Sequence, residues 1–126
     1  MPSDVSVMTP GADVPPDVAA FAGTWVGQFH TADVPMNQTL VVMKIEKDGD
    51  AWRAHVLFSH GEQPLWGYGP GYVITDGSIG LEGKLRLAPL PDGARLTYVM
   101  SPRRNLQGEL VLGGLHAYGT FVRVPR

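Results

Sequence analysis

The feature that most constrains this chain is a two-residue alternation of apolar and polar side chains, interrupted at short intervals by glycine-rich turns. Side chains spaced by two lie on one face of a β-strand, so this period indicates half-buried strands rather than helices. Positions that share an apolar face in this way are Trp25, Gly27 and Phe29, then Val41, Met43 and Ile45, and then Trp52, Ala54, Val56 and Phe58. The pattern predicts about eight short strands and no interior helix.

The turn residues indicate how these strands are connected. Asp48-Gly49 lies between two alternating runs and predicts a hairpin, and Asp76-Gly77 and Gly113-Gly114 predict further turns. Short consecutive hairpins favour a meander, and apolar faces on one side only favour a closed barrel. We therefore predict an all-β fold, a single antiparallel up-and-down β-barrel of about eight strands with a short N-terminal helical turn.

The length of 126 residues is typical of one domain. Residues 1–16 are rich in proline and poor in large apolar side chains, which predicts a flexible N-terminal tail followed by a barrel domain over residues 17–126. Pro15-Pro16 is suited to the start of a helical turn over residues 17–22, and Gly23 to its end.

Composition excludes several classes of function. The net charge is −2 and the basic residues are scattered, so we expect no nucleic-acid partner and no membrane partner. No apolar run approaches the ~20 residues of a membrane span, and the N-terminus lacks the features of a secretory signal. The chain has no cysteine, and its four histidines lack metal-ligand spacing. We expect a soluble, cytoplasmic protein without a metal or cofactor.

A short helical turn followed by Gly23-Thr24-Trp25 at the first strand, with Arg123 in the last strand, resembles the calycin group, which includes lipocalin and avidin-like barrels. The resemblance implies that Trp25 closes one end of the barrel and that Arg123 packs over its indole. It also implies an open opposite end that holds a ligand. The chain departs from typical lipocalins in its short length and in having no cysteine.

A second resemblance, to nitrobindin-type haem barrels, depends on residues 23–27, on Pro35 and on the spacing from His116 to Arg123. It implies haem as an alternative cofactor, with His116 as the iron ligand. The Gly-x-Gly spacing that usually follows the tryptophan is replaced here by Gln28-Phe29.

Residues 61–71 break the alternation and combine aromatic rings with glycines and prolines. Such a segment is suited to a lid over the open end, to a loop that completes the core, or to a partner-binding surface. Tyr98 lies on an apolar face, so its hydroxyl needs an internal partner or a ligand. The predicted ligand-binding residues are Met43, Trp52, Phe58, His60, Trp66, Tyr68, Tyr72 and Tyr98.

These residues predict binding of a small apolar or aromatic molecule in the barrel mouth. One alternative is a small barrel enzyme of the cyclase, isomerase or lyase type, with Tyr98, His60 or Glu62 as the acid–base group. Another is a protein-interaction module with a filled barrel. The sequence leaves open whether the chain forms a homodimer.

Overall fold

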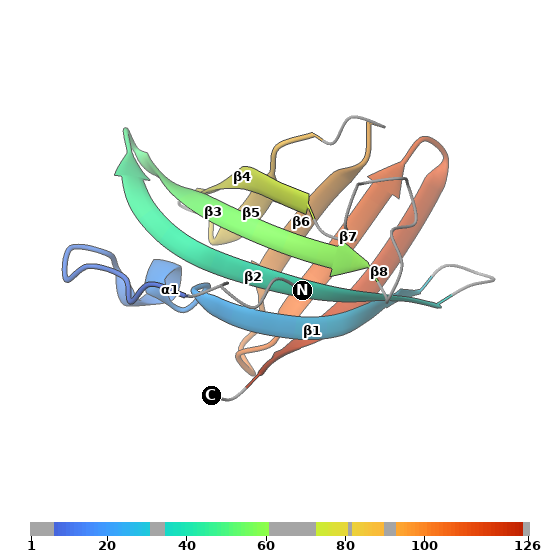
Figure 1. The fold of residues 1–126 in the computed structure, drawn as a ribbon, viewed down its shortest axis with the longest axis horizontal. Coiled ribbons are helices and arrows are strands. Elements are labelled where there is room, and N and C mark those ends of the chain that lie inside the picture. The colour runs from blue at the N-terminus through green and yellow to red at the C-terminus, as the bar shows by residue number, and fades with distance from the viewer. Residues whose placement is uncertain (1–6, 31–34, 61–72, 81, 90–92, 125–126) are drawn as a thin grey trace.

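The computed structural model describes residues 7–30, 35–60, 73–80, 82–89 and 93–124, and these form a closed antiparallel barrel (Figure 1). Each strand pairs with the next, and β1 also pairs with β8, which closes the sheet. The predicted all-β barrel with a short N-terminal helix is thus confirmed. The elements are α1 (Pro16–Ala19), β1 (Gly23–His30), β2 (Pro35–Asp48), β3 (Ala51–His60), β4 (Val73–Ile79), β5 (Lys84–Leu87), β6 (Arg95–Met100), β7 (Leu106–Leu112) and β8 (Leu115–Arg123).

One end of the barrel is covered by α1, next to the start of β1 and the end of β8 (Figure 1). Trp25 is fully buried there, and its indole Nε1–H donates to the carbonyl of Phe21 at 3.0 Å. The guanidinium of Arg123 lies 4.4 Å from the indole centroid and donates hydrogen bonds to the carbonyls of Ala20 and Ala22. A single side chain from the last strand therefore joins the first strand to the helical turn.

Gly23 makes this arrangement possible for two reasons. Its φ of 137° lies in the region that side chains other than glycine rarely adopt. A Cβ atom at this position would also overlap the guanidinium of Arg123. Gly23, two residues before Trp25, thus leaves the space that the guanidinium of Arg123 occupies beside the indole.

A bulge in β2 changes which of its residues face the core. The pairing with β3 shifts register between Val42 and Lys44, so one residue is inserted at Met43. Val42 and Ile45 are consequently both buried in the core, whereas Met43 is half-buried. The expected common face of Val41, Met43 and Ile45 was wrong, because uninterrupted alternation does not allow for the extra residue.

The predicted turn at Asp76-Gly77 was also wrong, since both residues lie within β4. Gly77 pairs with Leu87 on β5, and a Cβ atom there would lie 2.9 Å from Cδ1 of Leu85. The glycine at this position permits close packing between two strands rather than a reversal of the chain. Asp76 is exposed on the outer wall and contacts Nδ1 of His55 at 3.0 Å.

Part of the N-terminal segment contacts the barrel. The backbone N–H of Met8 donates to the carbonyl of Met43 at 2.7 Å, and Val14 is buried in the core cluster. Whether residues 1–16 form a separate tail stays a prediction. Within the described residues, no helix has the length and apolar character needed to cross a membrane.

An aromatic cluster occupies the barrel interior. Phe29, Tyr98 and Phe121 are fully buried, and the ring of Phe121 lies 5.2 Å from that of Phe29 and 5.6 Å from that of Tyr98. Both contacts are edge-to-face, the geometry that aromatic quadrupoles favour. Gly108 on β7 faces these rings and leaves the space that they fill.

We predict that Gly108→Ala destabilises the fold. The added Cβ would lie 2.8 Å from Phe121, 3.1 Å from Phe29 and 3.2 Å from Tyr98, so the rings would have to move. Overpacking of this kind costs about 1–3 kcal/mol of unfolding free energy, measurable by urea denaturation. Gly114→Ala is the matched control, because a Cβ at Gly114 meets nothing within 4 Å. Equal stabilities of the two variants would contradict this packing.

We also predict that Arg123→Met lowers the unfolding free energy by about 2 kcal/mol, because it removes one cation–π contact and two hydrogen bonds to carbonyls. Arg95→Met, at an exposed position on β6, is the control and should change the unfolding free energy by less than about 0.5 kcal/mol. A thermal or urea titration of both variants measures the difference. If Arg123→Met matches the control, Arg123 does not hold this end of the barrel together.

Candidate functional site

The barrel interior contains a buried polar pair among apolar side chains. The hydroxyl of Tyr98 on β6 donates to Oε1 of Gln38 on β2 at 2.5 Å. Tyr98 is 0% exposed and Gln38 is 2% exposed. Among the described residues, the other buried polar side chain is Ser59, at 8%. The hydrogen bond joins two strands that are not neighbours in the sheet, so it crosses the interior of the barrel.

Burial strongly raises the pKa of the Tyr98 phenol, and the hydrogen bond with Gln38 opposes this only in part. A phenol in this environment stays protonated at neutral pH and donates its proton in a hydrogen bond. It is therefore suited to orienting a polar group and poorly suited to accepting a proton as a general base.

The surroundings of the pair are apolar and largely aromatic. The Tyr98 ring contacts Phe121 edge-on and lies 6.5 Å from the ring of Phe29. Phe58 and Leu40 are fully buried in the same core cluster. Apolar surroundings with a few fixed polar groups are also the usual composition of a small-molecule site.

The pair lies toward the end of the barrel opposite α1. Gln38 is near the beginning of β2, and its backbone pairs with Gly27 on β1 and with His60, the last residue of β3. Trp25 and Phe21, in contrast, are buried at the end that α1 covers. A ligand that contacts Gln38 would therefore approach from the end at which β3 finishes.

The structure buries some of the predicted ligand-binding residues in the barrel, wholly or in part. Phe58 and Tyr98 are both fully buried in the core cluster, and Trp52 is half-buried and packs against it. Met43 is half-buried at the bulge and is not among the core-cluster residues. Their role in ligand binding stays a prediction.

The predicted rim falls mostly outside the described residues. His60 belongs to β3 and its backbone pairs with Gln38, but its side chain is outside the described part of the structure. Glu62, Trp66, Tyr68 and Tyr72 also lie outside the described residues. A lid formed by residues 61–71, and acid–base roles for His60 and Glu62, are therefore still predictions.

His116 is exposed on the outer wall, with its ring edge-on to Tyr118 at 6.3 Å. A haem bound through His116 would lie outside the barrel, so this position does not fit an interior haem. His55 also faces outward, where Nε2 contacts Glu46 at 2.7 Å and Nδ1 contacts Asp76 at 3.0 Å. Among the described residues, no group of three His, Cys, Asp or Glu side chains could hold a metal ion.

Gln38 is the site residue that sequence reasoning missed. Its position would have been apparent from Leu40 and Val42, which share its inward parity and are both fully buried. The bulge at Met43 reverses that parity relative to Ile45, so counting back from Ile45 assigns Gln38 to the outer wall.

The buried phenol predicts a pH dependence of stability. Because the pKa of Tyr98 is raised in the folded protein, its contribution is fully present below the unfolded value of about pH 10 and is lost as the pH rises above it. Tyr98→Phe should therefore show a shallower loss of stability above about pH 10. Phenolate absorbance recorded together with circular dichroism tests this, since part of the absorbance change should coincide with unfolding in the wild type and disappear in the variant. If the absorbance change that coincides with unfolding is as large in Tyr98→Phe as in the wild type, that result would contradict the burial of the phenol.

No protein-family model matches the chain, and no curated protein matches it. One solved structure that does match is a mutant of the fluorescent protein UnaG, with 18% sequence identity and a TM-score of 0.48. The match covers 86% of this chain and 99% of that chain. At this identity and score it supports no conclusion about a ligand. The closed antiparallel barrel itself gives this chain the architecture of a small calycin-like barrel.

Proposed function

We propose that the protein binds a small, largely apolar or aromatic molecule at the end of the barrel opposite α1. The observation that carries this proposal is the Tyr98–Gln38 hydrogen bond, buried among aromatic and aliphatic side chains. In the bound state, the pair would form the polar floor of the site.

A barrel filled only for stability has no need of this pair. Burying a phenol hydroxyl and an amide costs free energy that their mutual hydrogen bond only offsets, and apolar residues of similar size often stabilise as well or better. Polar groups inside an apolar pocket serve instead to orient a ligand. The proposed ligand accordingly has an apolar body and one hydrogen-bonding group.

The packing around the pair limits the depth of the proposed site. Phe29, Phe121 and Gly108 fit closely against Tyr98, and Trp25 is fully buried at the end that α1 covers. The ligand would therefore lie above the aromatic cluster, where the cluster offers flat apolar surface. Burial of that surface supplies the affinity, at about 25 cal/mol per Å².

Titration with 1-aminoanthracene, a neutral aromatic fluorophore with one amine, tests this proposal. We expect saturable fluorescence enhancement at one site per chain. Tyr98→Phe and Gln38→Leu should each weaken binding by about five- to tenfold, because the amine loses a buried hydrogen-bonding partner. Tyr118→Phe is the matched control, since Tyr118 is 57% exposed on the outer wall.

Two outcomes would contradict the proposal. The first is the absence of saturable enhancement, which would favour the filled-barrel interaction module. The second is equal affinity of Tyr98→Phe and Tyr118→Phe for the fluorophore, which would show that the buried pair does not contribute to binding. Circular dichroism of each variant confirms that the barrel remains folded.

A further inference from the structure

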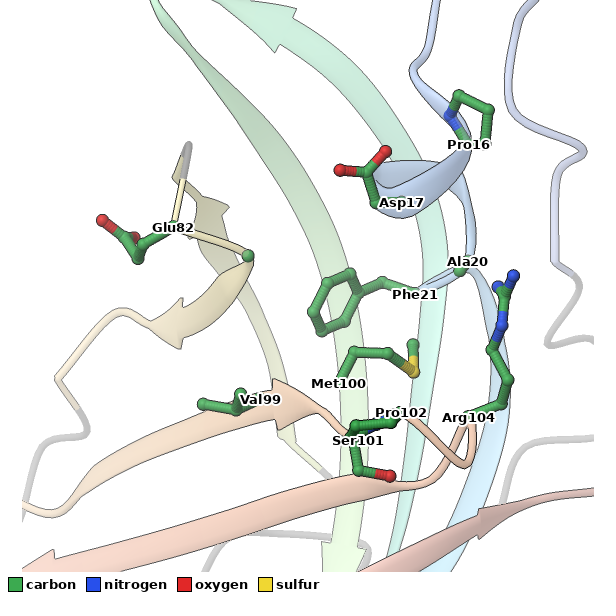
Figure 2. A pocket seen from close by; sticks show the side chains of 11 residues that line it. Pro16, Asp17, Ala20, Phe21, Glu82, Val99, Met100, Ser101, Pro102 and Arg104 are labelled. Atoms are coloured by element: carbon green, nitrogen blue, oxygen red, sulfur yellow. The ribbon is translucent and has the colours of Figure 1, made fainter.

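A pocket of about 410 Å³ lies at the end of the barrel that α1 covers. We call it the closed-end pocket; Figure 2 shows it between α1, the residues after β4 and the turn between β6 and β7. Phe21 and Met100 lie at its centre, and Asp17, Glu82 and Arg104 bring charge to its walls. None of the residues that line it belongs to the Tyr98–Gln38 site.

The backbone at Arg104 is unusual. Among the described residues, Arg104 is the one non-glycine residue with a positive φ, at 66°. Its N–H donates to the carbonyl of Ser101 at 3.0 Å, and the N–H of Ser101 donates to the carbonyl of Asn105 at 2.8 Å. In hairpin turns of this kind the left-handed position is commonly glycine. An arginine there adopts a disfavoured conformation, which indicates that its side chain has a use other than forming the turn.

The side chain of Arg104 extends toward Ala20 (Figure 2). The carbonyl of Ala20 already accepts a hydrogen bond from Arg123. Burial lowers the pKa of Arg123 and the nearby charge of Arg104 lowers it further, so the two cations lie close enough to repel each other. An anion beside Arg104 would relieve this repulsion.

The acidic residues of the pocket lie apart from Arg104. Figure 2 shows Glu82 across Phe21 from Arg104, and Asp17 on α1 above the ring. Glu82 is engaged by Arg86, with 2.8 Å between Oε1 and Nη1. These carboxylates would repel a second anionic group on the ligand, so the wall formed by Arg104 is the part of the pocket suited to an anion.

We propose that the closed-end pocket binds a small monocarboxylate with an apolar body. The carboxylate would bind the guanidinium of Arg104, and the apolar body would pack on Phe21 and Met100. A guanidinium and a carboxylate form charge-assisted, two-point hydrogen bonds, which are stronger than neutral ones. The volume of the pocket falls within the range of small-molecule sites.

The test compares 1-naphthaleneacetate with 1-naphthaleneacetamide, which has the same aromatic body without the charge. Amide resonances in two-dimensional ¹H–¹⁵N spectra of the full chain report both the position of binding and the affinity. We expect shifts confined to residues 16–21 and 82–105, and at least about tenfold weaker binding of the amide.

Arg104→Gly should weaken binding of the acid by at least about tenfold while leaving the melting temperature unchanged or raised, because glycine is favoured at this φ. Arg103→Gly is the matched control: Arg103 belongs to the same turn and is exposed, but it is not a residue of the pocket. It should leave binding unchanged. Tyr98→Phe should also leave it unchanged, which separates this site from the proposed site in the barrel interior.

Three results would overturn the proposal. The first is equal affinity for the acid and the amide, and the second is acid binding that survives Arg104→Gly. The third is a fall in the melting temperature of Arg104→Gly, because it would show that the Arg104 side chain serves to stabilise the fold rather than to bind a ligand.

Discussion

The contact between Arg123 and Trp25 joins the last strand to the first, and the α1 end of the barrel is organised around it. The guanidinium covers the indole and binds the carbonyls of Ala20 and Ala22, which lie between α1 and β1. Its interactions with the ring and the carbonyls fix β8 beside β1 and place the helical turn over the core. Because α1 has only four residues, it depends on these tertiary contacts for its stability.

The polar groups of the two large rings Trp25 and Tyr98 are satisfied in different ways. The indole N–H of Trp25 donates to the carbonyl of Phe21, so this ring needs no further hydrogen-bond acceptor at the α1 end of the core. The phenol of Tyr98 donates instead to a side chain, Oε1 of Gln38, across the interior. The two ends of the barrel thus differ in chemistry, with main-chain acceptors at one and a side-chain pair toward the other.

The alternation of side chains was sufficient to predict an antiparallel barrel, because every strand has one face on the core and the turns are short. It was insufficient where a single residue changes the register. The bulge at Met43 reverses the parity of β2, and this concealed Gln38 although Tyr98 was recognised as needing a partner. Asp76-Gly77 has turn composition, yet the glycine lies inside β4, where it permits close packing on Leu85. Both failures arise from contacts between strands, which the residue types within one strand do not encode.

The internal hydrogen bond of the polar pair has a consequence for selectivity in the proposed site. Without a ligand, Tyr98 and Gln38 satisfy each other, so a purely apolar molecule can bind without leaving a buried polar group unpaired. A molecule that inserts a hydrogen-bonding group between them must replace that bond with ones at least as favourable. The phenol stays protonated and donates, whereas Oε1 of Gln38 accepts. The preferred polar group is therefore one that both accepts and donates, such as a hydroxyl or an amide, because it alone satisfies both partners at once.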